Sequence, residues 1–141
     1  MIPIKSSFMN SSRSGQLYSL ALGVIAILGQ APFHLWFITI ICVACLVARL
    51  KLAREKSKPI ISGFSEGFCF GFGYFIAGTY WIGSAFIARG TEFIIIMPPM
   101  VIFLSLILAS FWGLAGALFS KAQKSGLVDY FGFVSLFFLA E

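Results

Sequence analysis

The sequence predicts an all-α fold, namely a polytopic membrane bundle of about five transmembrane helices, the last of them incomplete. Apolar residues make up 60% of the 141 residues, charged residues only 11%, and the mean hydropathy is +0.98. A soluble domain of this length has too small an interior to bury so many apolar side chains. No ten-residue segments of alternating polarity, as a membrane barrel needs, are present, so helices are the expected spanning elements.

A polar segment, residues 1–16, precedes the membrane domain, residues 17–141. The first apolar stretch follows a basic head and is similar to a signal peptide, but a second apolar run starts directly after it, so an uncleaved helix is expected. At 1.5 Å per residue this helix would be about 21 Å long, shorter than the roughly 30 Å hydrocarbon core. The expected spans are 17–30, 32–48, 60–87, 93–119 and 127–141.

The stretch "GQAPFHLW", residues 29–36, predicts a tight turn between the first two spans. Pro32 suits the first turn of a helix, where its missing N–H would have no partner anyway, and Trp36 suits a headgroup boundary. His34 is expected to be a polar loop residue, because no potential nucleophile or acid is close to it in sequence. The second span then meets a charged segment, residues 49–59, that ends at a helix-breaking proline.

The basic residues predict the orientation of these spans. Nine of the ten Lys and Arg residues fall before the first span, between the second and third, or between the fourth and fifth, and only Arg89 falls in a loop of the opposite set. By the positive-inside rule, the N-terminus is therefore expected in the cytoplasm. The net charge of +5 is explained by these flanks, and no nucleic-acid motif is present, so no nucleic-acid partner is expected. The nine residues are Lys5, Arg13, Arg49, Lys51, Arg54, Lys56, Lys58, Lys121 and Lys124.

Three cysteines, Cys42, Cys45 and Cys69, all lie in apolar stretches. The single C-x-x-C pair has no second pair or suitably spaced histidine, so neither a zinc site nor a disulfide framework is predicted. We expect small buried apolar side chains at these positions, and no metal or cofactor.

The third expected span, which contains "GFSEGFCFGFGYFIAGTYWIGSAF", is rich in glycine. Gly63, Gly67 and Gly71 recur every four residues and Gly78 follows seven residues later. This spacing predicts one helix face without side chains, against which another backbone can approach closely.

Glu66 lies in the same span, and an ionisable residue within a span is a functional candidate. It is also close in sequence to the basic segment, so the simpler expectation is a carboxylate at the membrane interface that faces Lys56 or Lys58. At the far end of the span, Tyr80 and Trp81 are expected to anchor the helix in the aromatic belt or to line a lipid cleft.

Two motifs carry a resemblance to a known family. The first motif, A-P-F-x-x-W, is Ala31, Pro32, Phe33 and Trp36. The second, G-F-x-x-G-x-G-x-F-x-x-G-x-x-W-I, is Gly67, Phe68, Gly71, Gly73, Phe75, Gly78, Trp81 and Ile82. Together with a fourth span and an apolar run ending in Glu141, these motifs resemble the N-terminal membrane region of apolipoprotein N-acyltransferases. By this resemblance, Glu141 would match the Glu that opens the E-W-L-R-G motif of that family.

The resemblance implies a bacterial inner-membrane enzyme of lipoprotein biosynthesis. Such an enzyme transfers an acyl chain from a phospholipid to the N-terminal diacylglyceryl-cysteine of an apolipoprotein. In the family, a Cys nucleophile, a Glu base and a Lys lie in a nitrilase-like domain that follows the membrane spans. None of the three cysteines matches that nucleophile, so no catalytic residue is assigned here.

The chain is accordingly expected to be a truncated fragment that is inactive alone, and a separate polypeptide that supplies the catalytic half is left open. An alternative is a small autonomous membrane scaffold or lipid-binding protein that assembles through its glycine face. A small transporter is disfavoured, because neither paired ionisable residues nor a repeat of broken helices is evident.

Overall fold

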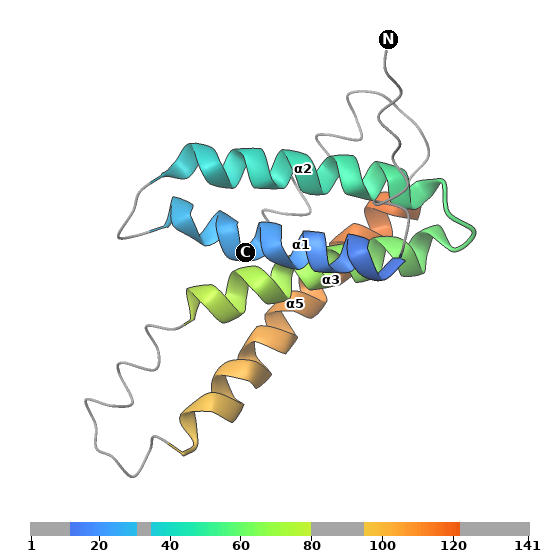
Figure 1. Cartoon of the computed structure of the whole chain (residues 1–141). Helices are drawn as coiled ribbons and strands as arrows, with labels where there is room; N and C mark the ends of the chain where they lie inside the picture. Colours follow the sequence, from blue (N-terminus) through green and yellow to red (C-terminus); the bar gives the residue numbers. More distant parts are fainter. Residues whose placement is uncertain (1–11, 31–34, 80–94, 122–141) are drawn as a thin grey trace.

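The computed structural model describes residues 12–30, 35–79 and 95–121, and every regular element in these ranges is helical (Figure 1). This confirms the all-α prediction. Three helices, α2, α3 and α5, are long and apolar enough to cross a membrane, so the protein is a membrane protein, while the number of five spans stays a prediction. The elements are α1 (Ser12–Ala26), the 3₁₀ turn η2 (Ile27–Gly29), α2 (Trp36–Arg54), α3 (Pro59–Gly78) and α5 (Met97–Lys121).

The first two helices extend beyond the spans expected from hydropathy. α1 begins at Ser12, and the Gln16 amide in its polar first turns donates a hydrogen bond to Ser65 Oγ on α3 at 2.5 Å. α2 continues past Ala48 to Arg54, so most of the charged segment is helix and only residues 55–58 connect α2 to α3. Hydropathy alone does not locate these ends, because Lys and Arg are good helix formers whatever their polarity.

The predicted turn at residues 29–36 is described only at its two ends. The Gln30 N–H donates to the Ile27 carbonyl at 2.9 Å, and the Leu35 N–H donates to the Leu28 carbonyl at 3.2 Å. The second of these bonds links η2 to the residue that precedes α2. Pro32 and His34 lie outside the described residues.

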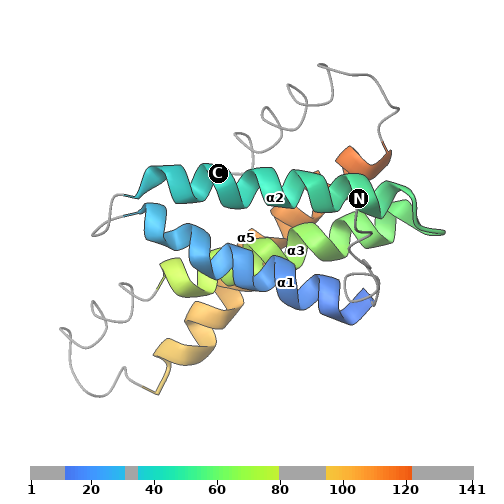
Figure 2. The same cartoon turned by 45° about the horizontal axis from the view of Figure 1, so that its top comes forward.

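α3 lies at the centre of the bundle and contacts α1, α2 and α5, as both Figure 1 and Figure 2 show. α1 and α2 run side by side over α3, whereas α5 crosses α3 and its N-terminal half points away from the other helices. Every described helix therefore has α3 as a neighbour. The features of α3 decide how the bundle is assembled.

The core of the bundle is built around Trp112 of α5, which is 4% exposed. Its ring stacks on Phe70 at a centroid distance of 5.1 Å and on Tyr74 at 5.7 Å, while Phe75 meets it edge-on at 6.0 Å. Aromatic pairs at these distances add to the stabilisation that burial provides. The large side chains in the α3–α5 contact are therefore mainly aromatic rings that pack around Trp112.

Arg54, the last residue of α2, holds the C-terminal part of α5. Its Nε and Nη2 atoms donate to the Phe119 carbonyl at 3.0 and 2.7 Å, and its guanidinium lies 4.1 Å above the Phe119 ring. The last carbonyls of a helix lack partners within the helix, and a cation near them is favourable. This contact ties the ends of α2 and α5 together.

Candidate functional site

All the Lys and Arg residues that the structure describes lie at one end of the bundle. This end is formed by the start of α1, the end of α2, the 55–58 connection and the end of α5 (Figure 1). Two acidic residues, Glu55 and Glu66, accompany these cations within the described ranges. The seven basic residues are Arg13, Arg49, Lys51, Arg54, Lys56, Lys58 and Lys121.

Glu66 of α3 is the centre of a buried polar cluster at this end. It is 2% exposed, and Arg49 of α2 donates from Nη2 to its Oε1 atom at 2.7 Å. Ser19 of α1 donates from Oγ to the other oxygen, Oε2, at 2.5 Å. The Lys56 ammonium lies 3.7 Å from Oε1. A single carboxylate thus binds groups from two other helices and from the α2–α3 connection.

This arrangement offsets part of the cost of burying charge, while the buried Arg49 Nε atom has no hydrogen-bond partner among the described residues. An isolated carboxylate in a low-dielectric interior is strongly unfavourable, and hydrogen bonds to charged groups offset that cost only when the geometry is good. Here both oxygens of Glu66 accept hydrogen bonds, and Arg49 also lies 6.0 Å from the Tyr18 ring centroid, within cation–π range. The cluster is suited to holding three helices in one arrangement rather than to proton transfer.

Gly15 provides the space for the Arg49 guanidinium. A Cβ atom at this position would overlap Arg49 Nη2 and would lie 3.0 Å from Glu66 Oε1. Any side chain at Gly15 would therefore displace the guanidinium from the carboxylate. α1 contributes to the cluster twice, through the Ser19 hydroxyl and through the missing side chain of Gly15.

Sequence reasoning predicted part of this cluster. The expected proximity of Lys56 to Glu66 is confirmed, and the structure adds that Glu66 is buried between the helices. The sequence predicts Arg49 in the segment between the second and third spans, whereas it is 5% exposed within α2. A signal was available, because Arg49 continues the helical spacing of the buried residues Cys42, Leu46 and Ala53.

The glycines of α3 serve two neighbouring helices rather than one. A Cβ at Gly67 would overlap the Trp112 carbonyl oxygen, and a Cβ at Gly71 would lie 2.8 Å from Trp112 Cβ, so both face α5. A Cβ at Gly73 would instead overlap the Leu20 carbonyl oxygen of α1. The predicted close approach is present, but Gly78 is not part of the α5 face, because its nearest neighbour is Ile27 of η2.

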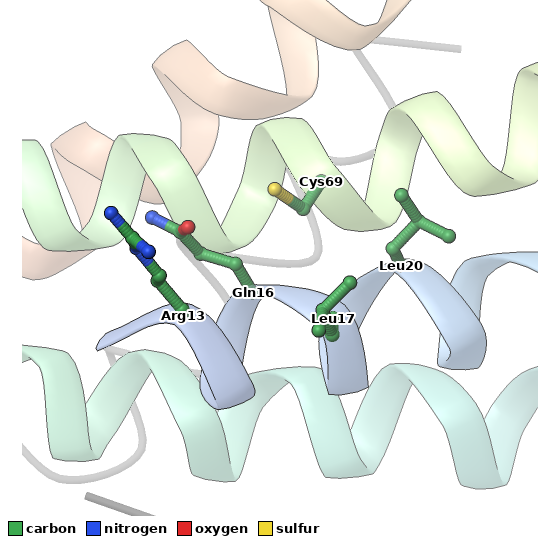
Figure 3. Close-up of a pocket in the computed structure, with 5 residues that line it drawn as sticks. All are labelled: Arg13, Gln16, Leu17, Leu20 and Cys69. Carbon is green, nitrogen blue, oxygen red and sulfur yellow. The ribbon is translucent and has the colours of Figure 1, made fainter. Parts of the chain in front are cut away.

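A shallow groove of about 420 Å³ lies between α1 and α3, close to the buried cluster (Figure 3). Arg13 and Gln16 line its polar end, and Leu17 and Leu20 continue along α1. Cys69 faces them from α3. The groove therefore combines a cationic end with an apolar wall.

The remaining predicted residues are placed as follows. Trp36 is 68% exposed at the start of α2, while Pro32, Tyr80, Trp81 and Glu141 lie outside the described residues. The three cysteines are free thiols, with Cys42 buried and the other two partly buried. No group of three potential metal ligands occurs among the described residues.

Comparison with known proteins identifies similar sequences. A protein-family model described as the apolipoprotein N-acyltransferase N-terminal domain matches residues 22–141. An apolipoprotein N-acyltransferase of Agrobacterium fabrum is 30% identical over 119 residues, which are 81% of this chain and 22% of that protein. The one from Azotobacter vinelandii is 31% identical over 130 residues, 90% of this chain and 24% of the relative.

A third relative, the apolipoprotein N-acyltransferase of Rhizobium leguminosarum bv. trifolii, is 34% identical over 107 residues, 72% of this chain and 20% of the relative. The chain thus spans about a fifth to a quarter of the length of these curated relatives. The segment matched by the family model contains Arg49 and Glu66 but begins after Gly15 and Ser19.

Proposed function

Because the chain belongs to the apolipoprotein N-acyltransferase family, we propose that it forms the N-terminal membrane part of an enzyme that acylates lipoproteins. The reaction would transfer an acyl chain from a phospholipid to the α-amino group of an N-terminal diacylglyceryl-cysteine. The observation that carries this proposal is the family match over residues 22–141, which includes all of α2, α3 and α5.

The proposed role of these residues is to hold the enzyme in the bilayer and to present the lipid substrate, not to perform the chemistry. The side chains of the buried cluster are bound to one another, and the glycines of α3 are in close contact with neighbouring helices. We propose that Tyr80 and Trp81, which follow α3 in the sequence, border a lipid cleft at the end of the bundle opposite the basic residues. On this proposal, the 141 residues alone transfer no acyl chain.

A chimera tests this division of roles. The Agrobacterium fabrum relative, with its matching segment replaced by residues 22–141, is expected to retain acyl transfer from a phospholipid to a diacylated lipopeptide. The 141-residue chain alone is expected to show no transfer above a protein-free membrane control. Transfer by the chain alone would refute the proposed role, and a chimera that inserts stably but is inactive would favour the membrane scaffold instead.

We also propose that the chain lies in the bacterial inner membrane with its N-terminus in the cytoplasm. The support is the gathering of all described basic residues at one end of the bundle, since Lys and Arg near span ends are retained on the cytoplasmic side. The start of α1 and the 55–58 connection would then be cytoplasmic, and the end of α3 would be periplasmic.

Reporter fusions measure this orientation. Alkaline phosphatase, which is active only in the periplasm, is expected to be inactive when fused after Ser57 and active when fused after Thr79. Green fluorescent protein at the same two positions is the matched control and should give the opposite pattern. Phosphatase activity at Ser57 together with fluorescence at Thr79 would reverse the proposed orientation.

A further inference from the structure

The groove between α1 and α3 has a polar, cationic part and an apolar part arranged along the same face of α1. Its residues on α1, Arg13, Gln16, Leu17 and Leu20, are spaced by three and four positions and therefore form one stripe of the helix. Figure 3 shows Arg13 and Gln16 at one end of this stripe and the two leucines beyond them. A molecule lying along the groove would meet a cation first and an apolar wall next.

The groups at the polar end differ in what they offer to a ligand. The Gln16 amide is bound to Ser65 Oγ, so it forms part of the groove wall. Arg13 is exposed, and its guanidinium can donate several hydrogen bonds in a fork that matches a phosphate group. Leu17, one helical turn along, is 68% exposed and presents apolar surface directly beside it.

The surroundings of the groove favour an anion. Seven cations and two carboxylates occupy this end of the described bundle, and one of the carboxylates, Glu66, is already bound by Arg49 and Ser19. Basic pockets between membrane helices bind anionic lipid headgroups, and each nearby Lys or Arg contributes about 1 kcal/mol to that attraction. The net positive charge therefore complements an anionic headgroup rather than a zwitterionic one.

We propose that this groove binds an anionic phospholipid of the surrounding leaflet, with the phosphate on Arg13 and an acyl chain along Leu17 and Leu20. This site requires only that the protein lies in a membrane, and it does not depend on the proposed acyl transfer. It lies at the basic end of the bundle, opposite the end proposed to present the acyl donor. The bound lipid would thus be a resident of the protein rather than its substrate.

Native mass spectrometry of the purified 141-residue chain, released from a detergent micelle, tests the proposal. The chain is titrated with phosphatidylglycerol and with phosphatidylcholine that carry the same acyl chains, and phosphatidylglycerol is expected to bind more tightly. Arg13→Gln is expected to weaken phosphatidylglycerol binding about fivefold, the effect of one lost charge at a membrane surface. Lys121→Gln is the matched control: it removes the same charge at the same end, but from α5, and is expected to change binding less than twofold.

A second variant tests the apolar wall. Leu17→Ser is expected to weaken the binding of both lipids by a similar factor. The preference for phosphatidylglycerol should remain, because the substitution leaves the charges unchanged. Glycerol phosphate, a headgroup without acyl chains, is expected not to compete at equal concentration. Equal binding of the two lipids, equal effects of Arg13→Gln and Lys121→Gln, or full competition by glycerol phosphate would each overturn the proposal.

Discussion

Arg49→Ala is expected to destabilise the bundle by about 3–5 kcal/mol, because it leaves the Glu66 carboxylate buried without its closest cation. The substitution removes a hydrogen bond of 2.7 Å to an oxygen of a residue that is 2% exposed. Lys56, at 3.7 Å and with a side chain 32% exposed, can replace only part of this interaction. Denaturation by sodium dodecyl sulfate of the protein in mild-detergent micelles would measure the loss.

Two further variants separate the ion pair from other effects of the substitution. Lys58→Ala removes an exposed cation from the neighbouring α2–α3 connection and should change the unfolding free energy by less than about 0.5 kcal/mol. The double variant Arg49→Met/Glu66→Met replaces the pair by apolar side chains and should recover most of the stability lost in Arg49→Ala. A double variant as unstable as Arg49→Ala would show that the unpaired carboxylate is not the cause.

Gly67→Ala is expected to cost about 1–3 kcal/mol, because the added methyl group has no space between α3 and α5. Its Cβ would overlap the Trp112 carbonyl oxygen and would lie 3.2 Å from the carbonyl carbon. Backbone atoms cannot rotate away as a side chain can, so the two helices would have to separate. That separation would also disturb the stacking of Trp112 on Phe70.

Gly78→Ala is the matched control for this prediction. Its Cβ would lie 2.8 Å from Ile27 Cδ1, the far end of a flexible side chain, which can move at little cost. The alanine also favours the helical conformation over glycine, so a net change of less than about 1 kcal/mol is expected. The same denaturation measurement would compare the two variants. Equal losses would contradict the assignment of Gly67 to a backbone contact.

The glycine face and the Glu66 cluster stabilise the bundle in different ways. In a bilayer, burial of apolar surface drives helix association weakly, because lipid tails are as apolar as the side chains. A larger share of the stability of the bundle therefore comes from close backbone approach at Gly67 and Gly71 and from hydrogen bonding at Glu66. Both features converge on α3, which explains why it contacts all the other described helices.

Several features could be predicted from composition and spacing alone. High hydropathy predicts helical membrane spans, and the i, i+4 glycines predict close packing, because both depend on properties of single residues along one helix. The family resemblance rested on the same glycine-rich segment together with the A-P-F-x-x-W turn, and the family match confirms it. The placement of Gly78 on the same face was wrong, because its nearest neighbour is Ile27 of η2, and spacing alone did not name α5 as the partner of Gly67 and Gly71.

Hydropathy and motif spacing predicted the fold class, the membrane location and the family, because both are local properties that need no knowledge of neighbouring helices. The burial of Glu66 with Arg49 and Ser19, and the space that Gly15 leaves for this pair, are seen only in the packed bundle. Arg49 and Ser19 are 17 and 47 positions away from Glu66 along the chain. These residues come into contact only when α1, α2 and α3 have the right rotation about their axes. Side-chain packing across the three helices determines that rotation.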